Sequence, residues 1–244
     1  MIEIRKLTQV PEFAEAVELQ KTIWGFDDVD LLPTRLFVTA GKIGGHSFGA
    51  FDGGRMVGFC LAIPGVKPDG KSYLHSHMLG VMKEYRDAGL GRKLKLAQRT
   101  DAIAEGLDLI EWTFDPLEIK NAFFNIERLG AIVRRFVLNQ YGTTSSPLNA
   151  GLPTDRCTAE WWLKSDRVSA ILEGREPERG EIVGRISITN DIYTIKANDF
   201  ARAREIQKRV ADQFLDYFSK NLAVTGFERS AENGTYLFTQ WESK

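Results

Sequence analysis

Arginine and glycine residues lie close together between residues 86 and 91, in the order Arg-Asp-Ala-Gly-Leu-Gly. An apolar run over residues 79–82 precedes them, and a helix-like stretch begins at Arg92. The first N–H groups of a helix have no internal partner, and the helix dipole adds partial positive charge, so a glycine loop that opens a helix favours an anion. Gly89 and Gly91 allow a close backbone approach, and arginine adds charge-assisted hydrogen bonds. The segment predicts a phosphate-binding loop.

Two common phosphate-binding patterns do not match this loop. The P-loop pattern G-x-x-x-x-G-K-[ST] fails because Arg92 stands in place of the lysine and no Ser or Thr follows it. The dinucleotide pattern G-x-G-x-x-G is not met either. The pattern present is Arg86-x-x-Gly89-x-Gly91 after an apolar strand. A plain strand-to-helix turn remains the alternative interpretation.

Two of the three histidines of the chain, His75 and His77, lie on the strand that leads into this loop. Side chains at positions i and i+2 share one face of a strand, so we expect both rings to face the same way as Leu79 and Val81. Imidazole has a pKa of about 6.5 and accepts a proton near neutral pH. Three roles are open for the pair: a base or proton relay, hydrogen-bonded core residues, or metal ligands, although no third ligand stands out nearby.

Glu111, on the strand expected over residues 107–114, is a second candidate base. A carboxylate in a half-buried cleft has a raised pKa and can accept a proton near neutral pH. The alternative interpretation is an ordinary carboxylate at a strand end that faces water.

Composition restricts the class of protein. The chain has 244 residues, is 43% hydrophobic and 27% charged, and carries a net charge of -1, which gives no overall attraction to nucleic acid or membranes. Cys60 and Cys157 lie far apart and lack the spacing of a disulfide framework or zinc site. Neither a signal-peptide pattern nor an apolar run of membrane-spanning length is evident, so we expect a cytoplasmic protein.

Hydrophobic periodicity predicts alternating strands and helices around these motifs. We expect strands over residues 2–7, 47–51, 56–63, 73–82, 107–114, 131–138 and 157–163. We expect helices over residues 11–24, 33–42, 91–105 and 117–129. Residues 143–155 are rich in Thr, Ser, Pro, Asn and Gly and predict a loop. Further on we expect a strand over 182–196, a helix over 198–218 and a hairpin over 222–241.

The loop motif and the order of elements over about residues 1–141 resemble the GNAT superfamily of acyl-CoA N-acyltransferases. The runs at residues 76–81, 112–117 and 121–125 are similar to an uncharacterised group of predicted acetyltransferases in that superfamily. Residues 74–81, Leu-His-Ser-His-Met-Leu-Gly-Val, resemble the strand of arylalkylamine N-acetyltransferases in which two histidines relay the amine proton.

The resemblance implies the fold class and the domains. The fold is expected to be α/β, with a GNAT-type mixed, largely antiparallel sheet flanked by helices. The GNAT-like acyl-CoA-binding domain would cover residues 1–165. Residues 166–244 would form a C-terminal α+β extension that packs on the core or on a partner subunit, which leaves a homodimer open.

The resemblance also implies site residues, with acetyl-CoA as the acyl-donor substrate. The pyrophosphate is expected to lie on Arg86, Asp87, Ala88, Gly89, Leu90, Gly91 and Arg92. Main-chain groups of Leu79, Gly80 and Val81 are expected to bind the pantetheine arm and the acyl carbonyl, since this strand splays from its neighbour in the superfamily. Asn121 would contact the pantetheine. His77, with His75, is the expected base, and Glu111 is its rival.

We therefore expect transfer of an acetyl or other acyl group from acyl-CoA to a small-molecule amine, by direct attack in a ternary complex. Neither cysteine is expected near the motifs as an acyl-enzyme nucleophile, and no metal, nucleic acid or membrane partner is expected. The alternative is a non-catalytic CoA-binding regulatory or interaction protein with a degenerate site. Ile126 favours it, because many members place a proton-donating Tyr there. The sequence leaves open the acceptor, the acyl length, the general acid, the oligomeric state and the role of the extension.

Overall fold

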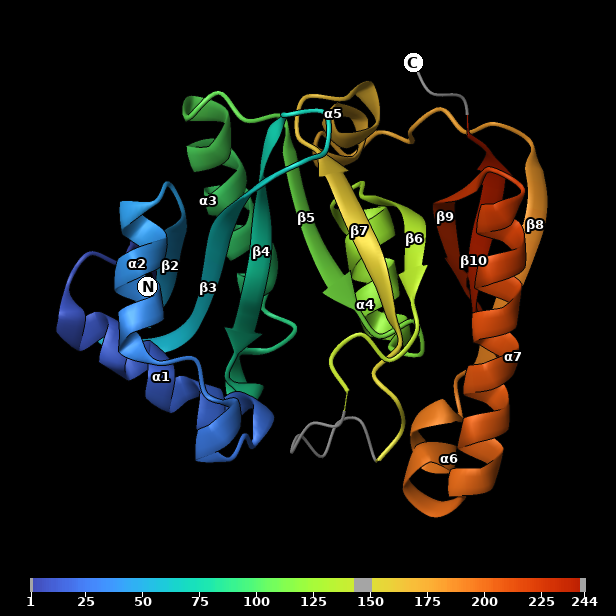
Figure 1. Cartoon of the computed structure of the whole chain (residues 1–244), viewed down its shortest axis with the longest axis horizontal. Coiled ribbons are helices and arrows are strands. Elements are labelled where there is room, and N and C mark those ends of the chain that lie inside the picture. The colour runs from blue at the N-terminus through green and yellow to red at the C-terminus, as the bar shows by residue number, and fades with distance from the viewer. Residues whose placement is uncertain (1, 143–150, 242–244) are drawn as a thin grey trace. The chain divides into compact units, whose positions relative to one another are not determined.

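The computed structural model describes residues 2–142 and 151–241, which form two compact units (Figure 1). The first unit ends at Trp112, and the second contains residues 113–142 and 151–241. The predicted loop over residues 143–155 lies outside the described residues as far as residue 150. The domain boundary expected between residues 165 and 166 stays a prediction.

The first unit is a sheet flanked by helices. Its strands are β1 (Ile2–Lys6), β2 (His46–Asp52), β3 (Arg55–Val66), β4 (Ser72–Val81) and the first part of β5 (Leu109–Phe114), in that spatial order. Its α-helices are α1 (Val10–Trp24), α2 (Thr34–Lys42) and α3 (Leu90–Ala104), with short 3₁₀ turns at Asp28–Asp30 and Lys83–Tyr85. Strands β1 to β4 pair antiparallel, and β4 pairs with β5 in parallel.

Helices cover both faces of this sheet (Figure 1). On one face, a Cβ atom added to Gly80 of β4 would lie 2.6 Å from Trp24 of α1. On the other face, Cys60 Sγ of β3 lies 4.0 Å from the carbonyl oxygen of Leu94 in α3. Strand β4 and its histidines therefore lie in the middle of a three-layer arrangement, and residues 86–91, the predicted anion loop, lie at the start of α3.

The second unit holds the remainder of the chain. Its strands are β7 (Arg156–Trp162), β6 (Ile132–Val137), β9 (Leu222–Arg229), β10 (Asn233–Gln240) and β8 (Ile182–Thr189), in that spatial order. Its helices are α4 (Ile119–Phe123), a π-helical turn (Phe124–Arg128), α5 (Asp166–Leu172), α6 (Ile192–Asn198) and α7 (Phe200–Ser219). The described pairs in this unit are antiparallel. The mixed, mostly antiparallel sheet flanked by helices is the fold class that the sequence predicted.

The C-terminal segment continues the sheet of the second unit. Strand β9 pairs with β6 at Val224 and Val133. Apolar side chains of α7 face inward, and Phe214 among them stacks on Phe136 of β6 with ring centroids 5.2 Å apart. Burial of these side chains removes apolar surface from water and is the main contribution of α7 to stability.

The strand predicted over residues 182–196 is wrong in its second half. Strand β8 ends at Thr189, and α6 begins at Ile192. Asn190 makes the turn between them, because its side-chain amide donates to the carbonyl oxygens of Ser230 and Ala231. A polar residue that bonds backbone carbonyls in this way ends a strand. Helix α5 was not predicted.

Candidate active site

The loop before α3 has an open helix N-terminus. Gly89 is the N-cap residue with a φ of 75°, a left-handed conformation that glycine adopts without strain. The first hydrogen bond at this end joins Lys93 N to Gly89 O at 3.1 Å, so the N–H groups of Leu90, Gly91 and Arg92 have no acceptor within the helix. A Cβ atom added to Gly89 would meet nothing within 4 Å. The space in front of these donors is therefore open.

Arg86 ties the loop to the end of β4. Its Nε donates to the carbonyl oxygen of Val81 at 3.2 Å, which holds the exposed guanidinium beside the loop. Asp87 follows with a φ of 64°, a conformation that is uncommon for a residue with a side chain. Asp87 and Ala88 are exposed. An exposed arginine beside free helix N–H groups fits a diphosphate, the anion predicted from the sequence.

Strand β4 contains a β-bulge at the second histidine. Ser76 lies opposite Ala62 of β3, whereas Met78 lies opposite Leu61, so His77 is the extra residue. Residues on either side of a bulge lose the simple alternation of faces. The expectation that the histidines share a face with Leu79 and Val81 assumed a regular strand.

Contacts with α3 on both sides of the bulge, at Ser76 and beside Leu79, show how the bulge changes the faces of β4. Ser76 points to α3, because its Oγ lies 2.8 Å from Lys95 Nζ. Leu79 lies opposite Cys60, which also faces α3. Ser76 and Leu79, three residues apart, therefore share a face, and His75 lies on the other one. The prediction that Leu79 and Val81 face the same way as His75 is wrong, and the bulge is the reason.

The histidine rings themselves lie close together. The centroids of His75 and His77 are 5.8 Å apart, as expected for neighbours on one face. Both side chains are partly exposed. Burial lowers the pKa of the His77 ring below its usual value, because the charged form loses hydration. A ring of this kind is neutral near pH 7 and can accept a proton.

The pairing of β4 with β5 ends early. The described pairs are Leu74 with Ile110 and His75 with Glu111, although β4 continues to Val81. Beyond this point the main chain of β4 is not used in the β4–β5 ladder within the described residues. The splay that the family resemblance implied is therefore present at the level of strand pairing.

Glu111 does not face water. It is 3% exposed, and Lys67 of the β3–β4 hairpin places its Nζ 2.5 Å from Glu111 Oε1. The interpretation as a solvent-facing carboxylate is wrong, because the hairpin covers the strand end and supplies a cation. Glu111 is in register with His75, so a role as base or as a partner of the histidines stays a prediction.

Cys60 lies nearer to the motifs than expected. It is directly opposite Leu79, on the strand beside β4. Its side chain is buried, and burial raises the pKa of the thiol to about 12. Since the thiolate is the nucleophilic form, this cysteine is unsuited to form an acyl-enzyme.

Two polar residues of α3, Lys95 and Gln98, were not predicted as part of the site. Both are buried and both bond Ser76 of β4. The sequence carries a signal for Gln98: Leu90, Leu94 and Gln98 recur every fourth residue, so a polar side chain stands where the inward stripe of an amphipathic helix calls for an apolar one. Lys95 lies outside this series.

Residues 13–130 match the family model of the GNAT acetyltransferase family. Residues 13–130 form a GNAT acetyltransferase domain. The match covers the anion loop, both histidines and α3. A search of curated protein sequences finds no significant match.

Solved structures of other proteins share the fold at low sequence identity. The ribosomal-protein-S18-alanine N-acetyltransferase from Escherichia coli is 18% identical, with a TM-score of 0.52, over 68% of this chain and 96% of its own. The protein smu.2055 from Streptococcus mutans is 14% identical, with a TM-score of 0.54, over 66% and 99%. Naa50 from Arabidopsis thaliana, in complex with the bisubstrate analogue CoA-Ac-MVNAL, is 13% identical, with a TM-score of 0.50, over 65% and 97%.

The region where many GNAT enzymes carry a tyrosine lies in the second unit. Ile126 stands there, fully buried in the π-helical turn. Asn121 of α4 is exposed, whereas Asn125 is buried. The regular helix expected over residues 117–129 changes to π-type bonding, since Leu129 N donates to Phe124 O, five residues earlier. A contact of Asn121 with CoA stays a prediction.

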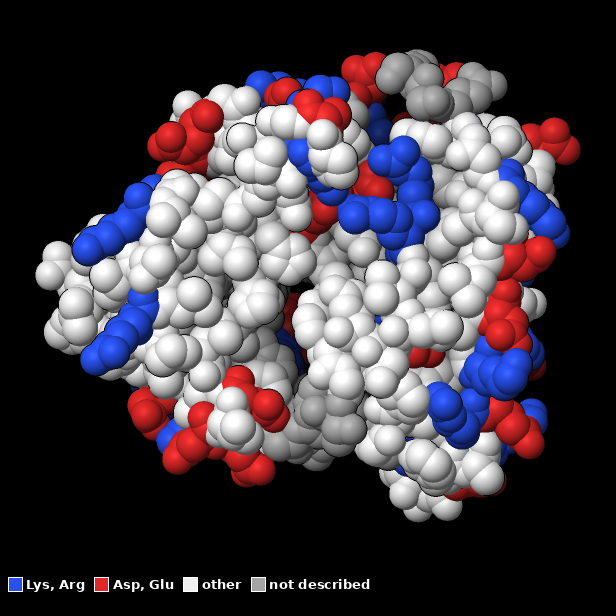
Figure 2. All heavy atoms as spheres, viewed as in Figure 1, with Lys and Arg blue, Asp and Glu red and all other residues white. Residues whose placement is uncertain are grey.

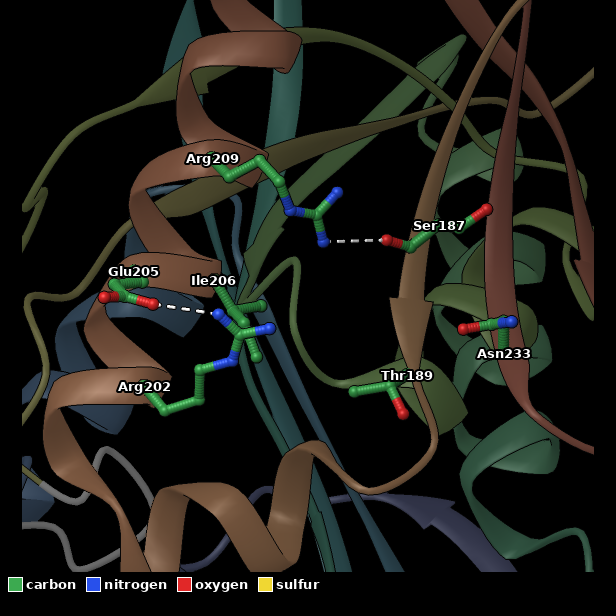
Figure 3. Close-up of a pocket in the computed structure, with 7 residues that line it drawn as sticks. All are labelled: Ser187, Thr189, Arg202, Glu205, Ile206, Arg209 and Asn233. Carbon is green, nitrogen blue, oxygen red and sulfur yellow. Dashed lines mark hydrogen bonds and ion pairs between the residues drawn. The ribbon is translucent and has the colours of Figure 1, made fainter.

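A separate concavity of about 460 Å³ lies between α7 and β8 of the second unit (Figure 3). Its two arginines already have partners: Arg202 pairs with Glu205 at 2.9 Å, and Arg209 donates to the carbonyl oxygen of Ser187 at 3.1 Å. None of its seven lining residues belongs to the anion loop or to β4.

Figure 2 shows acidic and basic side chains interspersed on the displayed face. No group of three or more His, Cys, Asp or Glu among the described residues is placed to hold a metal ion. Of the helices in residues 2–142 and 151–241, none combines the length and the apolar composition that crossing a membrane requires.

Proposed function

We propose that this GNAT protein transfers an acetyl or other acyl group from acyl-CoA to the amine of a small molecule. The observation that carries the proposal is an open helix N-terminus directly after the strand that bears paired histidines and leaves the β4–β5 ladder at His75. In this proposal, the base His77 and the diphosphate site at residues 86–92 lie within fewer than twenty residues of each other in the sequence.

Each part of the site has a defined task in this proposal. Arg86 and the N–H groups of residues 89–92 bind the pyrophosphate of acyl-CoA, and main-chain groups of Leu79, Gly80 and Val81 bind the pantetheine arm and the acyl carbonyl. His77, aided by His75, takes the proton from the amine. The amine nitrogen then forms a bond to the thioester carbon, and the C–S bond breaks to release the CoA thiolate. Direct attack is consistent with the buried, protonated Cys60.

The acceptor class is the finer part of the proposal. The paired histidines resemble those of arylalkylamine N-acetyltransferases and favour a small amine. Two of the structural neighbours carry names that specify a protein alanine or a peptide-containing analogue. An acceptor panel therefore has to include arylalkylamines, polyamines and peptides with free N-termini.

The first experiment is calorimetric titration of the wild-type protein and the Gly89→Val variant with acetyl-CoA and CoA. We expect micromolar binding to the wild type and about a tenfold loss in the variant, equivalent to about 1.4 kcal/mol, because valine strains the left-handed position and fills the open space. Gly70→Val is the matched control, since Gly70 is also left-handed and open but lies in the β3–β4 hairpin. Equal affinity in all three proteins would contradict the anion site.

Turnover separates this proposal from the second candidate, a CoA-binding regulatory protein without catalysis. That candidate is favoured by the buried Ile126, which has no proton to give to the departing thiolate. Binding of acetyl-CoA without acylation of any acceptor and without hydrolysis would support the second candidate over the first.

A further inference from the structure

Lys95 is a lysine of α3 whose amine lies where β4 and β5 stop pairing. The last described pair is His75 with Glu111, and the next residues on the two strands are Ser76 and Trp112. Lys95 Nζ donates to Ser76 Oγ at 2.8 Å and lies 3.6 Å from the centroid of the Trp112 ring. The amine therefore contacts one residue from each strand at the end of the ladder.

Burial of the Lys95 amine costs free energy, because a charged amine loses its hydration. Lys95 is 3% exposed, and no carboxylate in the described part of the chain forms an ion pair with it. Burial lowers the pKa of the amine to about 7. A leucine or methionine would fill the same volume without removing an amine from water. The presence of a lysine at residue 95 is therefore explained by the polar contacts of its amine and not by the volume that the side chain fills.

Those contacts connect α3 to the bulge of β4. Ser76 Oγ accepts from Lys95 and lies 2.9 Å from Gln98 Oε1, to which it can donate. Ser76 directly precedes His77, the bulge residue. Helix α3 also begins at the anion loop after Gly89. One rigid helix thus holds both the diphosphate site and the main chain next to the base.

Two other titratable groups face Lys95 from the neighbouring strands. The Cys60 thiol of β3 stays protonated because burial raises its pKa to about 12. The His46 ring of β2 has its Nδ1 2.7 Å from Asp101 Oδ2, and burial lowers its pKa below the usual value. A change of charge among these three groups near pH 7 therefore belongs to Lys95.

We propose that Lys95 is a positioning residue for acyl transfer: held between Ser76 and Trp112, its amine sets the gap at which the β4–β5 ladder ends and fixes the main chain beside His77. The inference rests on the proposed function, in which acyl-CoA lies along the end of β4 and His77 takes the proton. Lys95 acts through Ser76 and the bulge, and has no contact with the reacting atoms in this scheme.

The test compares Lys95→Met with Lys93→Met, an exposed lysine two residues earlier on the same helix. For both variants and the wild type we would measure acetyl-CoA affinity by calorimetry, the thermal unfolding midpoint, and kcat on an accepted amine between about pH 6 and pH 9. Ser76→Ala and the double variant Lys95→Met/Ser76→Ala complete a cycle that isolates the coupling between the two side chains.

We expect Lys95→Met to unfold at no lower temperature than the wild type, because it removes a buried amine. Its kcat should fall by about 10²-fold with little change in acetyl-CoA affinity, since a shift of about 1 Å at the reacting groups costs that much. Ser76→Ala should lose activity as well, and the double variant should lose no more than Lys95→Met. Wild-type kcat should decrease as the pH rises through 7, because the Lys95 amine loses its charge and its cation–π contact with Trp112 weakens. Lys95→Met should lack this decrease in kcat.

The outcomes separate the two proposals. A wild type that turns over, with unchanged kcat and pH profile in Lys95→Met and Ser76→Ala, would overturn the positioning role alone. A wild type that does not bind acetyl-CoA would overturn the proposed function and this inference with it. If Lys95→Met fails to fold, Ser76→Ala decides: full activity with the wild-type pH profile would overturn the role, and a selective loss of kcat would support it.

Discussion

His77 stands at the bulge of β4, and the pKa of its ring is lowered by burial. Only the neutral ring accepts a proton, and a lowered pKa keeps the ring neutral to a more acidic pH than an exposed histidine. The same burial costs stability in acid, since protons bind more readily to the unfolded chain below the usual pKa. Burial of the His77 ring thus favours its role as a base near neutral pH and lowers the stability of the fold in acid.

His77→Ala should lower kcat by about 10²–10⁴-fold, the usual contribution of a general base, while acetyl-CoA affinity stays unchanged. In the wild type, the logarithm of the rate should rise with pH in the acid range through a pKa below about 6.5, before the decrease expected near pH 7 from Lys95. Steady-state kinetics on an accepted amine measure both. His77→Gln is the control for side-chain size, because glutamine is polar and of similar size but does not accept a proton near neutral pH. A variant as fast as the wild type at every pH would assign the base role elsewhere, with Glu111 next.

At the scale of elements, the packing of α1 on β4 depends on one glycine. A Cβ atom on Gly80 would lie 2.6 Å from Trp24 Cη2 and 2.9 Å from Ile23 Cδ1, closer than real Cβ contacts. Trp24 also stacks on Phe26 with ring centroids 5.7 Å apart, so the indole has little freedom to withdraw. The absence of a side chain at residue 80 thus lets α1 lie against the strand that carries the histidines.

Gly80→Ala should destabilise the protein by about 1–3 kcal/mol, the usual cost of overpacking. Gly41→Ala is the matched control, because Gly41 lies in α2 with nothing within 4 Å of an added Cβ. That substitution should stabilise by about 0.5–1 kcal/mol, since alanine favours a helix over glycine. Urea denaturation measures both changes. Equal stability of the two variants would show that Trp24 moves aside without cost.

At the scale of the whole molecule, residues 166–241 contribute helices and strands to the second unit. The hydroxyl of Tyr236 in β10 donates to the carbonyl oxygen of Pro116 at 2.7 Å, and Phe227 N of β9 donates to Glu127 Oε1 at 2.7 Å. Lys196 of α6 is buried and lies 3.0 Å from Asp115 Oδ2. The segment before residue 166 therefore shares its hydrogen bonds and its core with the segment after it.

Removal of residues 166–244 should leave a chain that aggregates, because the edge of β6 and the apolar surface under α7 lose their cover. Soluble yield and the cooperativity of thermal unfolding, compared with the full chain, measure the effect. A full chain with a protease site inserted in the exposed segment after Gly174 is the control, and it should stay folded after cleavage. A soluble, cooperatively unfolding fragment of residues 1–165 would show that the extension is dispensable for folding.

The sequence by itself determined the features that depend on neighbouring residues. The strand over residues 73–82, the glycine turn at Gly89 and the helix after it were predictable, since the apolar run, the glycine and the amphipathic pattern act over a few residues. The GNAT superfamily and the fold class followed from the order of such elements. The pairing of His75 and His77 followed from the period of a strand.

Only the tertiary structure decided which residues surround this motif. The bulge at His77 depends on the register of β4 with β3. The ion pair of Glu111 depends on Lys67, which lies 44 residues away in the chain. The burial of Lys95 depends on strands β4 and β5, which pack against α3. The same holds for Cys60, which faces Leu79 only because β3 and β4 form a hairpin. These contacts join residues far apart in the chain, and local pattern contains no information about which distant partners the core brings together.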